Sequence, residues 1–186
     1  MLVEIKKDSP GIILEIAYAT SGPLNFTKKP VYKKSLCFLH EEAAQKIYTI
    51  AERARELGFS LKIFDAFRPT EAQWKLWEFC PDPTFVADPK RGSAHSRGIA
   101  VDLTLVDVHT QKELDMGTPF DDFTELSFHK NREISPLAQK NRLLLLGLMT
   151  EGGFDFYEKE WWHYQLFDAQ KYSLLSDQEA PQSIMS

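Results

Sequence analysis

The stretch Gly92–Asp102 constrains this chain more than any other, because it places a histidine and an aspartate seven positions apart between glycines. Seven residues of extended strand would span about 23 Å. His95 and Asp102 can therefore bind one ion only if the chain turns back between them. Gly98 permits that turn and Gly92 loosens the approach to it. The aspartate then projects from the polar face of an alternating strand, where small neighbours leave room for an ion.

A candidate third ligand follows in the segment Glu160-Trp161-Trp162-His163. Glu160 and His163 are three positions apart, so on one flat strand they would point to opposite faces. A bend after Tyr157-Glu158-Lys159 would bring both to one side, with His163 as ligand and Glu160 over the open position. Two histidines and one carboxylate form the ligand set of a catalytic zinc site that leaves its fourth position to water. The common metalloprotease helix HExxH is absent.

The residues alone leave a second interpretation open. In it His95 caps a turn, Asp102 bonds to a loop and His163 is buried among tryptophans. The other three histidines are expected to be solvated surface residues: His40, His109 and His129.

Composition excludes several classes of protein. The chain has 186 residues and a formal charge of −5, which argues against nucleic-acid or anionic-membrane partners because both need a basic patch. Cys37 and Cys80 lack CxxC spacing and are expected to be free thiols in a reducing compartment. The longest apolar run, 143–148, is too short to span a membrane, and the N-terminus lacks a signal-peptide core. We therefore expect a cytoplasmic protein.

Hydrophobic spacing predicts a single α+β domain over residues 1–186, with a mainly antiparallel sheet flanked by helices. Strands are expected at 12–18, 61–67 and 99–106, with a strand-like aromatic segment at 160–167, and helices at 41–57, 70–79 and 136–149. Gly58 would close the first helix. Thr70-Glu71-Ala72-Gln73 would form a capping box on the second. Ser135 would cap the third, and Gly152-Gly153 would stop it. The tail after about residue 176 is expected to fray.

Four motifs in order resemble the D-alanyl-D-alanine dipeptidase (VanX-type) family of zinc peptidases, over about residues 12–175. They are Ser93-x-His95-Ser96-Arg97-Gly98-x-Ala100-x-Asp102 with Glu160-x-Trp162-His163, Asp65-Ala66-Phe67-Arg68-Pro69, Asp115-Met116-Gly117-Thr118-Pro119-Phe120-Asp121, and Tyr18-Ala19-Thr20 followed by Asn25-Phe26-Thr27. The resemblance implies the fold that D-Ala-D-Ala carboxypeptidases share with the hedgehog signalling domain.

Three positions depart from the family pattern. Tyr18 and Asn25 are seven apart where five are expected, Lys28 stands where the family usually has glycine, and Phe67 replaces a tyrosine. These departures concern the rim of the pocket and leave the metal ligands intact.

The resemblance implies that His95, Asp102 and His163 bind one Zn²⁺ per chain. It also implies that Glu160 is the general base and acid, and that Arg68 stabilises the oxyanion. The expected reaction is hydrolysis of D-alanyl-D-alanine to two D-alanine, and the preference for D-residues comes from the resemblance alone.

A free dipeptide is a zwitterion, so the pocket must recognise both of its ends. Asp121 is the first choice for the ammonium group and Asp115 the second. The carboxylate would meet Ser93, Ser96 or Arg97, the last of which is equally compatible with a structural role. Two tryptophans, Trp161 and Trp162, are expected to wall the pocket.

Two alternatives stay open. A D,D-carboxypeptidase acting on cell-wall peptides would need access to the envelope. A non-catalytic zinc-binding module of the same fold would need neither Glu160 nor Arg68. The oligomeric state is not indicated by the residues.

Overall fold

The computed structural model describes residues 1–186. Its main sheet has the strand order β2-β4-β5-β7-β6, in which only β2 and β4 are parallel. The strands are β2 (Ile12–Leu14), β4 (Phe59–Asp65), β5 (Ala100–Asp107), β6 (Asp155–Phe156) and β7 (His163–Gln165). A two-stranded sheet pairs β1 (Leu2–Glu4) with β3 (Phe38–His40). The predicted α+β domain with a mainly antiparallel sheet is confirmed.

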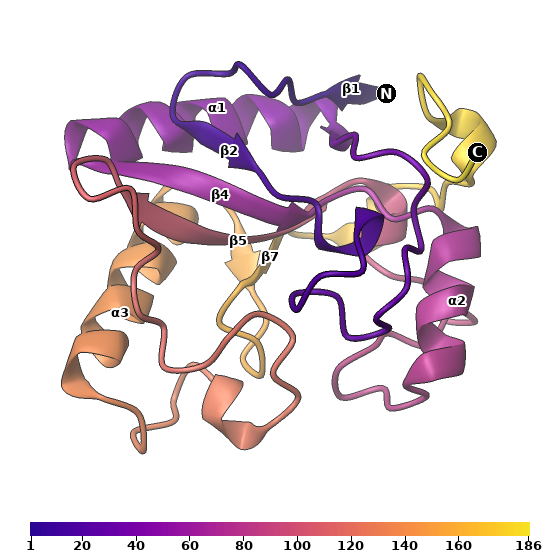
Figure 1. Cartoon of the computed structure of the whole chain (residues 1–186). Coiled ribbons are helices and arrows are strands. Elements are labelled where there is room, and N and C mark those ends of the chain that lie inside the picture. Colours follow the sequence, from indigo (N-terminus) through magenta and orange to yellow (C-terminus); the bar gives the residue numbers. More distant parts are fainter.

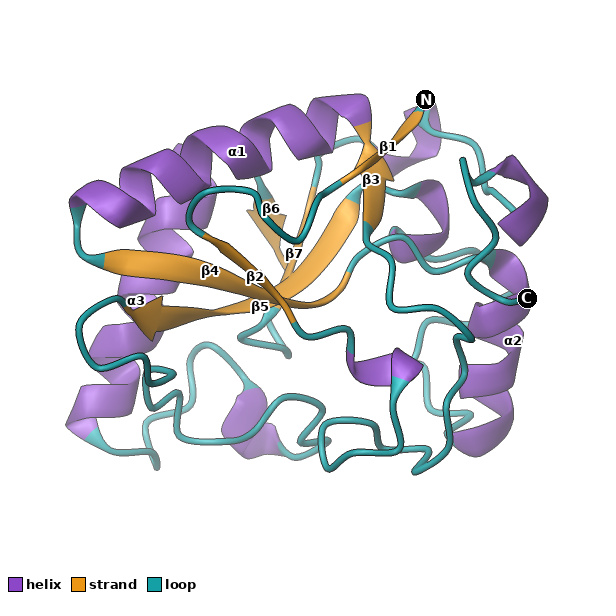
Figure 2. Ribbon diagram, turned by 45° about the horizontal axis from the view of Figure 1, so that its top comes forward, coloured by secondary structure: helices purple, strands orange, loops and turns teal.

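Three helices surround the sheet: α1 (Glu41–Glu56), α2 (Thr70–Phe79) and α3 (Pro136–Glu151). Helix α1 lies along β4 on one side of the sheet, and α2 stands apart at one end of the molecule (Figure 1). Helix α3 contacts α1 and β6. Loops predominate on the side away from α1 (Figure 2). No helix combines the length and the apolar character needed to traverse a bilayer.

The helix ends follow local chemistry in two cases out of three. Gly58 takes a left-handed φ of 85° after α1, as predicted. At α3 the Ser135 hydroxyl accepts a 3.0 Å hydrogen bond from the Ala138 N–H. The predicted capping box on α2 is wrong, because Pro69 is the N-cap residue and no side chain caps it. Gln73 is buried instead and bonds elsewhere.

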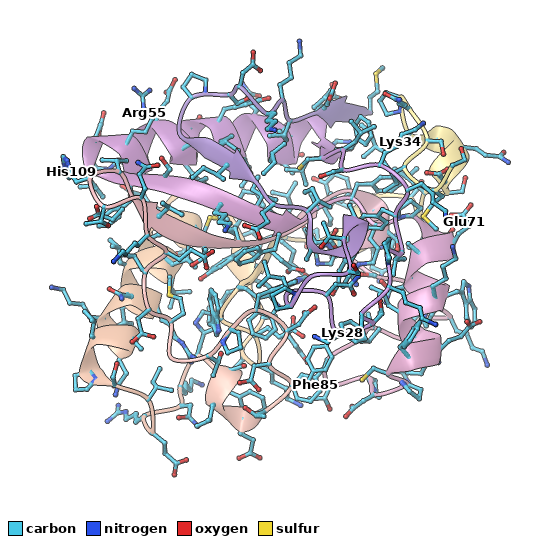
Figure 3. All side chains as sticks on the ribbon, viewed as in Figure 1. Lys28, Lys34, Arg55, Glu71, Phe85 and His109 are labelled. Atoms are coloured by element: carbon cyan, nitrogen blue, oxygen red, sulfur yellow. The ribbon has the colours of Figure 1, made fainter.

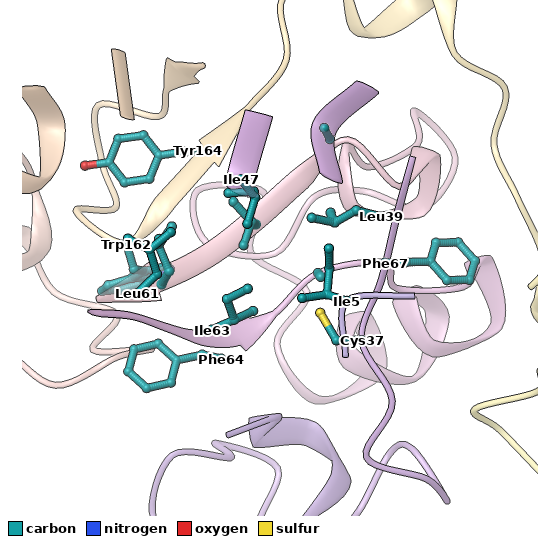
Figure 4. Close-up of a cluster of buried hydrophobic side chains, with 14 of the residues drawn as sticks. Ile5, Cys37, Leu39, Ile47, Leu61, Ile63, Phe64, Phe67, Trp162 and Tyr164 are labelled. Carbon is teal, nitrogen blue, oxygen red and sulfur yellow. The ribbon is translucent and has the colours of Figure 1, made fainter. Parts of the chain in front are cut away.

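A β-bulge in β4 is decisive for the site. From Phe59 to Ile63 the register of β4 against β5 is regular, and then it shifts so that Asp65 pairs with Asp102. Alternation alone would put Asp65 on the same face as Ile63. The extra residue, Phe64, lets Asp65 share a face with Asp102. Figure 4 shows Ile63 and Phe64 on opposite sides of β4.

The main core lies between α1 and the sheet, where Ile47 packs over Leu61 and Ile63 (Figure 4). These three side chains are fully buried. A smaller aromatic layer covers the other face, with Phe64 stacked on Phe120 at 4.8 Å between ring centroids. Apolar side chains thus pack against both faces of the sheet and hold strand β5, with its polar residues, in place.

Two of the predicted strand segments are longer than the observed strands. Strand β2 ends at Leu14, and a 3-10 turn at Ala17–Ala19 follows. Only His163–Gln165 of the aromatic segment is strand.

The expectation of a frayed tail is also wrong. Ser176 and Glu179 form a capping box on a short 3-10 turn. Ile184 is fully buried, and its carbonyl accepts a 2.7 Å hydrogen bond from the Lys33 N–H. The apolar Ile184 side chain therefore anchors the end of the chain to the core.

Candidate active site and metal centre

His95 reaches the site on a short 3-10 turn, His95–Arg97, that ends at Gly98 with a left-handed φ of 68°. A Cβ at Gly98 would lie only 2.5 Å from Leu2 Cδ2 and 3.2 Å from the His40 backbone nitrogen, so both the backbone angle and the space favour glycine. The chain turns back here, as the spacing predicts. Gly92 also takes a left-handed φ, of 82°.

Asp102 and His163 come from adjacent strands, since β5 and β7 pair them directly. A turn precedes β7, in which the Glu160 carbonyl accepts a hydrogen bond from the His163 N–H at 3.3 Å. This is the predicted bend, and it brings Glu160 and His163 to the same side.

Three potential ligand atoms converge at one point. His95 Nε2 lies 3.2 Å from His163 Nδ1 and 3.2 Å from Asp102 Oδ2. His163 Nδ1 lies 3.0 Å from Asp102 Oδ1. Tetrahedral zinc with bonds of about 2.0–2.1 Å would set neighbouring ligand atoms about 3.3 Å apart. The spacing of the three residues therefore fits such an ion.

Hydrogen bonds on the far side of each ring fix the two tautomers. His95 Nδ1 lies 2.7 Å from the Ala66 carbonyl, which can only accept, so Nδ1 carries the proton. His163 Nε2 lies 3.0 Å from Gln165 Oε1 and donates to it in the same way. The inward-facing nitrogen of each ring is then unprotonated, and its lone pair points toward the Asp102 carboxylate. Such an arrangement requires a cation, and its outer partners are those that orient metal-binding histidines.

The charge on Asp102 follows from these neighbours. Burial alone would raise the pKa of Asp102, but in the metal-free site protonated His95 and His163 rings outweigh burial and hold the pKa below its ordinary value, and a metal cation would take the place of those protons. The carboxylate is therefore ionised and ready to bind a cation.

Glu160 lies beside this centre without joining it. Its Oε2 is 4.0 Å from His163 Nδ1, and the side chain is nine-tenths buried. Burial raises the pKa of Glu160 well above its ordinary value, and the Asp102 and Asp121 carboxylates raise it further. A carboxyl group with a raised pKa suits proton transfer near neutral pH.

Arg68 is held rigidly against the same cavity. Asp65 Oδ2 accepts hydrogen bonds from its Nε at 2.9 Å and pairs with its Nη2 at 2.8 Å. Gln73 Oε1 accepts from Nη1 at 3.0 Å. The guanidinium carbon lies 5.2 Å from the centre of the Tyr18 ring, and Nη2 lies 3.7 Å from Asp102 Oδ2. A buried, oriented cation thus faces the candidate metal centre.

These residues line one cavity of about 300 Å³, the lower end of the range for ligand pockets. The predicted residues on its wall are His95, Asp102, His163, Glu160, Arg68, Asp121, Ser93, Arg97 and Trp162. Asp121 accepts a hydrogen bond from Tyr18, and burial raises its pKa well above the ordinary value. Acidic side chains and the Arg68 and Arg97 guanidinium groups therefore share this wall.

Three of the residues predicted for the pocket do not line the cavity. Asp115 is exposed and accepts a 2.8 Å hydrogen bond from the Gly117 N–H, as a turn aspartate does. Ser96, in the middle of the His95–Arg97 turn, is buried and does not line the cavity. Trp161 donates to the Thr118 hydroxyl at 2.8 Å rather than walling the pocket.

The surface prediction for the other histidines holds only for His109, which is exposed. His40 is half-buried and its Nδ1 accepts from the Glu42 N–H at the start of α1. His129 is largely buried, and burial lowers its pKa to about 4.

One departure from the family pattern has a backbone explanation. Lys28 takes a φ of 57°, the left-handed region where glycine is favoured. Phe67 is buried and does not line the cavity, so its missing hydroxyl does not alter the pocket.

Most of the residues that the sequence did not reveal orient other functional side chains through hydrogen bonds. Gln165 carries no motif signal, and Gln73 is concealed by an apparent capping box. Asp65 lies in a quoted motif, but the bulge that aims it is invisible in the sequence.

Comparisons with known proteins agree with this geometry. A peptidase M15 family profile described as D-ala-D-ala dipeptidase matches residues 1–183. The D-alanyl-D-alanine dipeptidase of Escherichia coli (strain K12) is 44% identical over 177 residues, covering 95% of this chain and 90% of the relative. The enzyme of the same name from Enterococcus faecium is 33% identical, covering 85% and 87%. That from Streptomyces coelicolor is 32% identical, covering 84% and 86%. The chain therefore belongs to the D-Ala-D-Ala dipeptidase family of metallopeptidases.

Proposed function

We propose that this protein hydrolyses the dipeptide D-alanyl-D-alanine to two D-alanine, with zinc at His95, Asp102 and His163. The convergence of two bare imidazole nitrogens and an ionised carboxylate carries the proposal. The relatives' names supply the substrate and its stereochemistry. Nitrogen-rich ligand sets favour zinc over magnesium or calcium.

Zinc bound at such a site lowers the pKa of a coordinated water and polarises a carbonyl. Glu160 accepts the proton of the attacking water and delivers it to the leaving amine. Its position beside His163 and its raised pKa support this role, because the carboxyl group must hold the proton between the two steps.

Arg68 stabilises the oxyanion that forms when the carbonyl is attacked. Its guanidinium is already oriented by Asp65 and Gln73, so little reorganisation is needed in the transition state. The positively charged guanidinium group faces the candidate metal centre next to Asp102.

The two ends of the zwitterionic dipeptide contact different groups: the ammonium meets a carboxylate, and the carboxylate meets a hydrogen-bond donor. Asp121 accepts the substrate ammonium, whose positive charge offsets the cost of burying that carboxylate. Ser93 lies on the cavity wall, and its oxygen accepts from the His95 N–H, which leaves its hydroxyl proton free for the substrate carboxylate.

The test is release of free alanine from D-alanyl-D-alanine, with L-alanyl-L-alanine and a pentapeptide ending in D-alanyl-D-alanine as controls. We expect cleavage of the D,D-dipeptide alone, lost on zinc chelation and restored by zinc. Cleavage of the pentapeptide but not the dipeptide would assign a D,D-carboxypeptidase instead. Zinc binding with no cleavage of either would assign a non-catalytic binding module.

A further inference from the structure

The segment Pro81–Arg91, called here the wall segment, forms one side of the cavity through residues 83–87. Its backbone bonds are mostly internal: the N–H groups of Phe85 and Val86 both donate to the Asp82 carbonyl. Only two hydrogen bonds join it to distant parts of the chain. A wall with so few attachments depends on each of them for its position.

The two attachments are side chains. Gln73 Nε2 donates to the Ala87 carbonyl at 2.7 Å, and the Tyr157 hydroxyl donates to the Thr84 carbonyl at 3.0 Å. Apolar contacts add to them, since Val86 is buried and Phe85 stacks on Phe123 with 5.0 Å between centroids. Phe85 lies on the loop side of the sheet, away from Arg55 on α1 (Figure 3).

Gln73 has a second partner at the other end of its amide. Its Oε1 accepts from Arg68 Nη1 at 3.0 Å, and the residue is only 1% exposed. Asp65 uses a single oxygen, Oδ2, for both Nε and Nη2 of the guanidinium. Gln73 is therefore the contact that fixes the remaining edge, Nη1. A side-chain amide offers both a donor and an acceptor at one terminus, which matches this pair of neighbours.

We propose that Gln73 is a positioning residue that couples the wall segment to Arg68. When the wall segment is in place, Ala87 orients the Gln73 amide, and the amide orients the guanidinium toward the reacting carbonyl. When the wall segment moves away, the amide loses one partner and Arg68 loses its fixed edge. The inference deepens the proposed function, on which the role of Arg68 rests.

Three variants separate the two ends of the amide. Gln73→Met keeps length and loses both hydrogen bonds. Gln73→Glu keeps an acceptor for Arg68 in either protonation state. Tyr157→Phe loses only the other attachment of the wall segment. Each is prepared with zinc, and zinc content and cooperative unfolding show that it is folded.

The readouts are kcat and KM for D-alanyl-D-alanine, amide hydrogen exchange of residues 83–88, and protection of the Arg68 Nη1–H in NMR spectra. Gln73→Met should lower kcat about tenfold through misplacement of Arg68. Its wall-segment amides should exchange about tenfold faster, as expected from loss of one hydrogen bond. Its Arg68 Nη1–H should lose protection, because that group donates to Gln73. Gln73→Glu should recover most of kcat, because an ion pair with Arg68 orients the guanidinium without help from Ala87, while its wall-segment amides still exchange faster. Tyr157→Phe should speed exchange with a smaller fall in kcat.

The coupling is overturned if Gln73→Met leaves wall-segment exchange or Arg68 Nη1–H protection as in the wild type. It is also overturned if Gln73→Glu is as slow as Gln73→Met. Absence of turnover in the wild-type protein would instead sink the proposed function, and the exchange and NMR readouts would still decide the coupling.

Discussion

The Tyr18 hydroxyl donates a 2.7 Å hydrogen bond to Asp121 Oδ2, although 103 positions separate the two residues. Asp121 also takes a left-handed φ of 56°. The hydrogen bond favours the ionised form of Asp121, while burial and nearby carboxylates raise its pKa. The carboxylate thus lies at the cavity wall with a hydroxyl partner but without a cation of its own.

Asp121→Asn should raise KM for D-alanyl-D-alanine about 10²-fold while kcat changes less, because a charge-assisted contact to the ammonium is lost. Steady-state kinetics measure the effect. An N-acetylated dipeptide is the matched control, since it has no ammonium and should not distinguish the variant from the wild type. Equal KM values for the free dipeptide would remove Asp121 from substrate binding.

Glu160→Gln should lower kcat by about 10²–10⁴, the usual contribution of a general base. The amide keeps the shape of the side chain but cannot accept the proton. Zinc content, measured by elemental analysis, should stay at the wild-type value, because Glu160 lies beside the ligand set rather than within it. A variant that retains turnover would show that another group moves the proton.

Arg68→Lys should lower kcat about 10²–10³-fold, as for loss of an oxyanion donor. Lysine keeps the charge but lacks the planar guanidinium whose separate edges bond Asp65 and Gln73, so the cation is less firmly oriented. Stopped assays with saturating dipeptide give kcat directly. A change confined to KM would make Arg68 a binding residue.

Gln165→Leu should weaken zinc binding about 10–100-fold, because His163 loses the acceptor that holds its Nε2 proton. Competition with a chelator measures the dissociation constant without any turnover. Gln165→Glu is the control, since its carboxylate also accepts from Nε2 and should preserve or strengthen binding. Unchanged zinc affinity in Gln165→Leu would mean that the tautomer is fixed in another way.

His129 should make the protein less stable in acid. Burial, with help from the Arg142 charge, lowers the pKa of His129 to about 4 in the folded state, while Glu158 opposes the shift. In the unfolded chain the pKa is about 6.5, so between these values only the unfolded state binds the proton. The free energy of unfolding therefore falls as the pH falls through this window.

Between about pH 8 and pH 5 the loss due to His129 should be about 2 kcal/mol. Urea denaturation of metal-free protein at both pH values measures it, and His129→Gln should lack that part of the loss. Identical pH dependence in wild type and variant would contradict the assignment.

Much of this fold follows from local signals. The stripe of α1 ends at the Gly58 turn, and Ser135 begins α3 as its side-chain chemistry predicts. Spacing also predicts the turn at Gly98 that brings His95 back beside Asp102, whereas the role of His95, Asp102 and His163 as metal ligands is implied by the family resemblance.

The remainder depends on long-range packing that no local pattern encodes. The bulge at Phe64 decides where Asp65 points, and alternation alone would place that residue on the wrong face. Gln73 has the spacing of a capping box, yet its partners, Arg68 and Ala87, come from outside the helix. Ile184 looks like part of a polar tail, and only the tertiary fold supplies the cavity that buries it.

The direct pairing of Asp102 with His163 joins the chemistry of this protein to its assembly. A slip of one residue between β5 and β7 would turn His163 toward the opposite face and separate the ligands. An ion that needs both side chains can bind only after these two strands, which are distant in the sequence, have paired in the correct register. Metal binding would then stabilise only the correctly paired fold, since a chain with misaligned strands could not bind the ion and would be less stable than the metal-bound chain.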